Sequence, residues 1–138
     1  MKLIILQGRD QVAREFPQLH HLFERVAIGA ADGEFSASDL REMAEEGRVH
    51  IGVAQQDGRT VFAFAFEFIS YPRLLVLNVI AGAGGHLGAV MAGFWEQFRE
   101  FAKEAGVNCI QASCGPGMAR LLRRHGFSTT YRVVRSKL

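Results

Sequence analysis

The sequence predicts a single mixed α/β (α+β) domain spanning residues 1–138, with a central, mostly antiparallel sheet of about six strands flanked by about four helices. Short apolar runs alternate with longer amphipathic stretches, Asp57-Gly58 separates two apolar runs as a hairpin turn would, and a glycine-rich turn joins a strand to a long helix. The expected order is β-α-α-β-β-β-α-β-α-β. At 138 residues, of which 49% are hydrophobic, the chain can bury one full core.

The N-terminal third predicts a strand and two helices. Residues 2–6 form the strand, and Pro17 lies inside the helical pattern that follows, where it either kinks the helix or marks its start. Ser36 or Ser38 then caps a short helix that runs to about Glu46. The first helix is predicted from apolar residues at spacings of four and three, which are Val12, Phe16, Leu19, Phe23 and Val26.

Two strands, 49–55 and 60–69, flank Asp57-Gly58, the strongest hairpin signal in the chain. In the second strand Phe62, Phe64, Phe66 and Phe68 alternate onto one face, and Glu67 lies on the other. A strand this apolar would aggregate at an open edge, so we expect it at the centre of the sheet.

The C-terminal half predicts a strand at 74–80, a helix at 86–105, a strand at 107–113, a helix at 117–125 and a last strand at 127–134. A glycine turn, 82–88, links the first strand to the first helix. The free N–H groups and positive dipole at such a helix start suit a phosphate-bearing ligand. We therefore expect a binding site there.

Charge is distributed unevenly, because residues 105–138 contain six basic residues and no acidic one, whereas acidic residues outnumber basic ones in 1–104. The basic third is either a solvated face or a surface for phosphates or an acidic protein. Stacking aromatics are limited to Phe127 and Tyr131, which does not favour nucleic acid. Apolar runs such as 61–66 are far shorter than the roughly 18 residues of a membrane span, and no secretory signal precedes them, so a cytoplasmic location is expected. Cys109 and Cys114 are expected to be reduced thiols.

The element order resembles the GNAT superfamily of acyl-CoA-dependent N-acyltransferases, as do Ala102-Lys103-Glu104-Ala105-Gly106 and the segment that leads into Gly126-Phe127. The resemblance implies that acyl-CoA lies between the fourth and fifth strands and acylates an amine. It implies Glu67 as general base, with Asn78 holding a water for relay. The cofactor-binding residues implied are Val79, Gly84, Gly85, His86, Leu87, Gly88, Ala89, Arg120 and Arg123.

The chain departs from the family pattern at four positions. Ala83 stands where the family has Arg or Gln, and His86 where it has glycine. Gly115 replaces an asparagine, and Leu122 replaces the tyrosine that commonly acts as general acid. These departures support an alternative: a catalytically inactive GNAT-fold binding or assembly module, similar to internal virion and morphogenesis proteins of tailed phages, whose protein partner would meet the basic third.

Other catalytic patterns are incomplete. A dinucleotide fingerprint starting at Gly82 needs glycine at position 87, which is leucine, and a phosphate loop would need a Lys-Ser or Lys-Thr that is missing. His20-His21 with Glu24 lacks further metal ligands, so no metal is expected. Cys114 with His125 lacks an orienting third group, and the cysteine is interpreted as small core filler.

Overall fold

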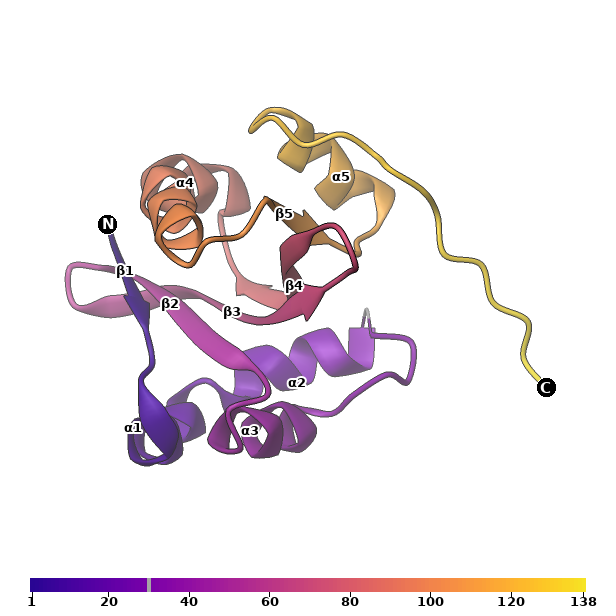
Figure 1. Cartoon of the computed structure of the whole chain (residues 1–138). Helices are drawn as coiled ribbons and strands as arrows, with labels where there is room; N and C mark the ends of the chain where they lie inside the picture. The colour runs from indigo at the N-terminus through magenta and orange to yellow at the C-terminus, as the bar shows by residue number, and fades with distance from the viewer. Residues whose placement is uncertain (30) are drawn as a thin grey trace.

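One five-stranded sheet forms the centre of the computed structural model, which describes residues 1–29 and 31–138 (Figure 1). The strand order is β1-β2-β3-β4-β5; the first three pairings are antiparallel, and β4 pairs with β5 in parallel. The predicted mixed, mostly antiparallel sheet is therefore confirmed, with one strand fewer. The strands are β1 (Lys2–Ile5), β2 (His50–Gln56), β3 (Arg59–Ser70), β4 (Leu75–Gly84) and β5 (Cys109–Ala112).

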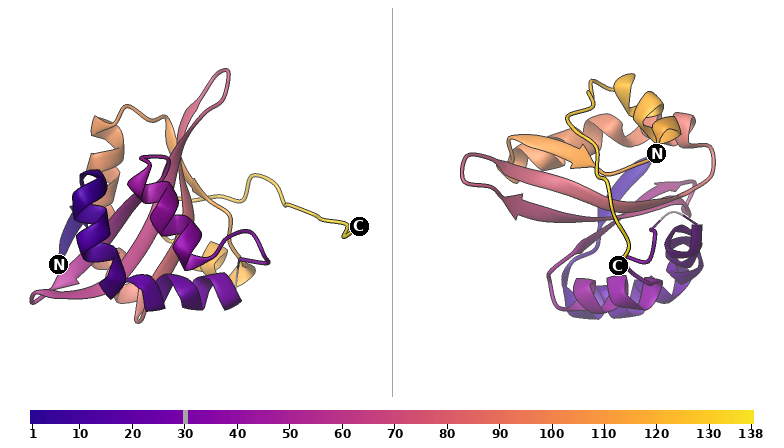
Figure 2. Two further views of the ribbon diagram at one scale, coloured as in Figure 1. Left: turned by 90° about the horizontal axis from the view of Figure 1, so that it is seen from below. Right: turned by 90° about the vertical axis from the view of Figure 1, so that its right-hand side faces the viewer.

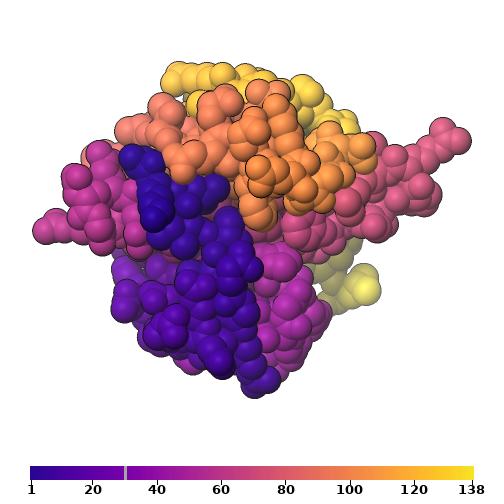
Figure 3. Space-filling view, turned by 60° about the vertical axis from the view of Figure 1, so that its left-hand side comes forward, coloured from indigo at the N-terminus to yellow at the C-terminus, as the bar shows by residue number. Residues whose placement is uncertain are grey.

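Helices cover both faces of the sheet. One face carries α1 (Gly8–Glu15), the 3-10 turn η1 (Phe16–Gln18), α2 (His20–Gly29) and α3 (Ala37–Glu45); the other carries α4 (Leu87–Glu104) and α5 (Pro116–Arg123) (Figure 1). The N-terminal residues lie against α4, as the space-filling view shows (Figure 3). Two hydrogen bonds hold them there: Leu3 N–H donates to Gln97 Oε1, and Gln97 Nε2 donates to the Met1 carbonyl, each over 2.9 Å.

The N-terminal helical pattern is divided at Pro17, which lies in η1 between α1 and α2. Proline cannot donate the backbone hydrogen bond of a continuous helix, so the chain turns there. Ser36, rather than Ser38, caps α3: its hydroxyl accepts from Asp39 N–H over 3.1 Å, and the Asp39 carboxylate accepts from Ser36 N–H over 2.9 Å. Both bonds satisfy amides that the helix itself leaves free.

β3 lies at the centre of the sheet, as its apolar sequence predicts. Phe62, Phe64 and Phe66 are buried beneath α4, whose Phe94 and Phe98 contact them. On the opposite face Ala63 and Ala65 leave room for the N-terminal helices. Phe16 of η1 and Phe23 of α2 pack there in a second core cluster. The Asp57-Gly58 hairpin is confirmed, since both residues have positive φ, as a tight hairpin turn requires.

The glycine-rich segment differs from the prediction. β4 does not end at Ile80 but continues to Gly84, where it pairs with Phe62, and only Gly85 and His86 separate it from α4. Gly82 lies under the ring of Phe62: a Cβ there would come within 2.8 Å of Phe62 Cζ. This glycine therefore makes space for an aromatic side chain rather than forming a turn.

The predicted sixth strand at 127–134 is wrong. After α5 the chain has no regular secondary structure and extends away from the sheet (Figure 2). Arg135 pairs with Glu34, and with Asp32 over 3.5 Å, in the loop between α2 and α3. In the described part of the chain no helix is long and apolar enough to cross a membrane.

Candidate functional site

The strands β4 and β5 separate part-way along their length. They pair from Val76 opposite Cys109 to Val79 opposite Ala112; beyond that point β4 continues with β3 alone, and β5 leads into α5. The separation coincides with an extra residue in β4 at Ile80, because Ala65 pairs with Ala81 while the next residue, Phe66, pairs with Val79. Such a bulge bends its strand and increases the local twist. Beyond Val79 and Ala112 the two adjacent strands therefore diverge.

The strands diverge toward the edge of the sheet where two helices begin. Because β4 and β5 are parallel, their carboxyl ends meet at the same edge of the sheet, and α4 and α5 follow directly from those ends. The positive end of each helix dipole is therefore directed at this edge.

The first turn of α4 presents free amides to solvent. Val90 N–H bonds to the His86 carbonyl, so the amides of Leu87, Gly88 and Ala89 precede the first intrahelical bond, and no side chain of the described residues caps them. Gly85, His86, Gly88 and Ala89 are exposed, and a Cβ at Gly85 or Gly88 would meet no atom within 4 Å. His86 adopts the left-handed conformation, with φ of 53°, and its ring makes no cap bond. These amides remain available to an anionic ligand.

A row of polar side chains crosses three strands just before β4 and β5 diverge. Glu67 on β3 lies opposite Asn78 on β4, and Asn78 lies opposite Gln111 on β5. Directly opposed residues project to the same face of a sheet, with Cβ atoms roughly 5 Å apart. Gln111 Nε2 donates to Asn78 Oδ1 over 3.3 Å and lies 3.5 Å from the Tyr71 hydroxyl. All three row members are half-buried. The two predicted catalytic residues are thus neighbours.

Sequence reasoning missed Gln111. Gln111 is a polar residue within the short strand Cys-Ile-Gln-Ala, just as Asn78 is a single polar residue among apolar neighbours in β4. The register of β4 against β5 is what places the two amides together, and no local pattern encodes that register.

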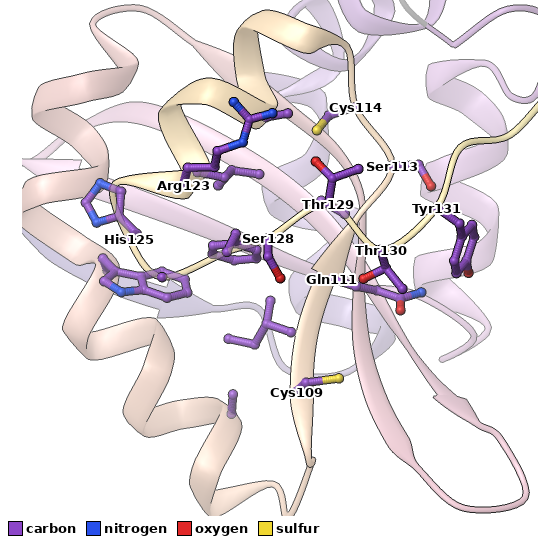
Figure 4. A pocket seen from close by; sticks show the side chains of 18 of the residues that line it. Cys109, Gln111, Ser113, Cys114, Arg123, His125, Ser128, Thr129, Thr130 and Tyr131 are labelled. Atoms are coloured by element: carbon purple, nitrogen blue, oxygen red, sulfur yellow. The ribbon is translucent and has the colours of Figure 1, made fainter.

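The predicted arginines both lie on α5 and are exposed. Arg123 lines a hollow beside β5 (Figure 4), whereas Arg120 does not. Neither makes an ion pair with the described residues, so both guanidinium groups are available.

The other titratable patterns form no catalytic group. His20 Nε2 lies 3.7 Å from Glu24 on the surface, and the described residues hold no cluster of three metal-binding side chains. Cys109 and Cys114 are free thiols, as expected, but both are exposed, so the prediction that Cys114 fills the core is wrong. Partial burial nevertheless raises the pKa of the Cys114 thiol, which disfavours the nucleophilic thiolate.

Comparison with solved structures identifies the fold. No known family model and no curated protein sequence matches the chain. It superposes on a ribosomal-protein-alanine N-acetyltransferase from Brucella melitensis biovar Abortus 2308 with a TM-score of 0.72 and 12% identity, over 100% of both chains. The chain has a GNAT fold.

Further GNAT structures give the same result. A possible acetyltransferase from Clostridium difficile 630 has a TM-score of 0.71 and 7% identity, covering 99% of this chain and 97% of its own. An aminoglycoside acetyltransferase from an uncultured soil metagenomic sample, in complex with sisomicin, has a TM-score of 0.69 and 14% identity, covering 99% and 94%. At such low identities the similarity establishes the GNAT fold alone, because activity depends on the residues of the site.

Proposed function

We propose that this protein is an acyl-CoA-dependent N-acyltransferase. One observation carries the proposal: β4 stops pairing with β5 after Val79 and leads, two residues after its end at Gly84, into three uncapped amides at the start of an 18-residue helix. The alternative of an inactive assembly module gains no support from the structures to which the chain is similar, since those named above are described as acetyltransferases or, in one case, as a possible acetyltransferase.

The residues present fit the phosphate-bearing part of acyl-CoA. The amides of Leu87, Gly88 and Ala89 would donate to the pyrophosphate, with the helix dipole adding to the attraction. The open space at Gly85 and Gly88 lets phosphate oxygens approach the backbone. Exposed Arg120 and Arg123 would meet the remaining nucleotide phosphates. Val79 and Ala112, the last paired residues, would border the acyl arm.

Bound acyl-CoA supplies an activated thioester carbonyl. The chain would hold an amine against that carbonyl, and such positioning alone supplies a large share of the rate enhancement. The Glu67 carboxylate would take the proton from the attacking amine, directly or through a water held by Asn78 Oδ1. Gln111, which donates to that same oxygen, would fix its direction. Leu122 offers no proton, so the departing thiolate would be protonated from solvent.

Calorimetric titration with CoA and acetyl-CoA tests the binding step. Gly88→Asp places a carboxylate among the amides, where it competes with the pyrophosphate and repels it, so we expect affinity to fall by at least about tenfold, or 1.4 kcal/mol. Gly88→Ala is the matched control, because its methyl group would enter open space and should leave affinity within about twofold. If the unaltered protein gives no heat and no thermal shift at millimolar CoA, the acyltransferase proposal is wrong and the fold serves binding alone.

Glu67→Gln tests the chemical step. Thiol release from acetyl-CoA, followed across a panel of small and peptide amines, should slow by roughly 10²- to 10⁴-fold while CoA affinity stays unchanged. An unchanged rate would remove Glu67 from the mechanism without affecting the CoA-binding result.

A further inference from the structure

β5 has one free edge. It pairs with β4 alone, and in the described chain no strand lies on its other side. The segment after α5, which sequence reasoning placed in the sheet, makes no backbone hydrogen bond beyond Phe127 within the described residues. An edge of this kind exposes a row of N–H and C=O groups that can pair with another extended segment.

An open hollow of about 1020 Å³ runs along this free edge, from Val107 to Gly115. Its floor is apolar: Trp95, Ile110, Leu122 and Phe127 line it, and the Trp95 and Phe127 rings lie 5.2 Å apart. In Figure 4, β5 borders the hollow on one side, and the segment carrying Ser128 to Tyr131 passes over its upper end. An additional strand laid beside β5 would therefore cover exposed apolar surface while pairing its backbone.

The charge of the hollow is one-sided. Four cationic side chains line it and no acidic residue does; the four are Arg99, Lys103, Arg123 and Arg132. Lys103 Nζ lies 3.4 Å from Glu100, and the other three make no ion pair with the described residues. Long basic side chains at the rim of an apolar groove favour carboxylates in whatever occupies it.

We propose that the free edge of β5 binds an extended acidic segment of a partner protein as an additional strand. The segment would have the usual length of a strand, roughly six residues or about 20 Å. Its alternate side chains would be apolar and lie against Trp95 and Phe127, and the carboxylates between them would pair with Arg99 and Arg132 at the rim. A second copy of this chain is a poor occupant, because its own C-terminal segment carries Arg132, Arg135 and Lys137. This surface lies on the edge of β5 away from β4, so the inference does not depend on acyl transfer.

Fluorescence anisotropy with a labelled eight-residue peptide that alternates valine with glutamate tests this inference on the full chain. We expect saturable binding that weakens as salt is added. A peptide with lysine in place of glutamate should bind at least about tenfold more weakly. A third peptide, with proline at two central positions, should also lose binding, because it cannot donate to β5.

Variants of the protein test where the peptide binds. Arg99→Glu combined with Arg132→Glu should lower the affinity for the acidic peptide by at least about tenfold. Arg73→Glu, on the exposed β3–β4 turn outside the hollow, should leave that affinity unchanged. Circular dichroism checks that each variant is folded. Three outcomes overturn the inference: no saturable binding up to about 1 mM peptide, equal binding of the acidic and basic peptides, or a protein dimer that the acidic peptide fails to dissociate.

Discussion

Replacing Gly82 by alanine distinguishes a glycine needed for packing from one needed for a ligand. The alanine Cβ would lie 2.8 Å from Phe62 Cζ, against an ordinary contact of 3.4–4 Å, so the ring must move by more than half an ångström. Phe62 is 6% exposed and packs against Phe64 and Phe94, with ring centroids 6.0 and 5.9 Å away, so the displacement reaches the centre of the α4-side core.

Overpacking of this kind costs about 1–3 kcal/mol of unfolding free energy. For a chain of this length that corresponds to a fall in Tm of roughly 3–10 °C. Phe62→Leu removes the atom with which the new Cβ clashes. The variant that combines Gly82→Ala with Phe62→Leu should therefore lose less stability than the sum of the two single variants, by about 0.5 kcal/mol or more. Gly85→Ala is the matched control, because its Cβ meets no atom within 4 Å. Its free energy of unfolding should change by less than about 0.5 kcal/mol.

Urea unfolding followed by Trp95 fluorescence measures the free energy of unfolding of each variant, and calorimetric titration measures its affinity for CoA. Gly82→Ala should lower stability and leave the affinity for CoA within about twofold, the reverse of the pattern expected for Gly88→Asp. The reasoning is refuted if Gly82→Ala is as stable as the unaltered protein but loses CoA binding, because the glycine would then act in a ligand loop.

Two further predictions concern stability. Ser36→Ala removes the cap of α3 and should lower the free energy of unfolding, measured with urea, by about 1 kcal/mol. Ser38 is exposed in the first turn of α3, so Ser38→Ala should change the free energy of unfolding very little. Equal losses in the two variants would contradict the cap assignment. Burial lowers the pKa of His50, whose ring lies 5.3 Å from that of Phe66, so protonation favours the unfolded chain. The stability that depends on the neutral ring is present above the ordinary pKa of 6.5 and is lost as pH falls through the lower folded value. His50→Gln should flatten the acidic side of the stability–pH curve, and an unchanged curve would exclude His50 as its cause.

The sequence indicates the layers of this fold well because they follow from local periodicity. Four phenylalanines at a spacing of two predict a central strand with one apolar face, and three of them, Phe62, Phe64 and Phe66, lie under α4, whereas Phe68 is exposed. The Asp57-Gly58 turn and the start of a helix after His86 are likewise fixed by residues a few positions apart. The capping box at Ser36 belongs to the same class.

Features that depend on distant residues were not predictable in this way. Gly82 and Gly84 look like loop residues until Phe62, some twenty positions earlier, is placed over them. The segment after Gly126 has the β-branched and aromatic residues of a strand, yet Arg135 is paired near residue 34. Gln111 joins the candidate site only through the parallel register of β5 against β4. In each case long-range pairing overrides local preference.

The two ends of the chain differ in how well they would accept a fusion or a label. The Met1 carbonyl and the Leu3 amide are both bonded to Gln97, and the Met1 side chain lies against Gly93 on α4, where a Cβ would come within 2.9 Å of its sulfur. A fusion or fluorophore attached ahead of Met1 would have to leave sideways along that helix. Leu138 instead points into open solvent, so immobilisation or labelling there would leave the sheet and α4 undisturbed.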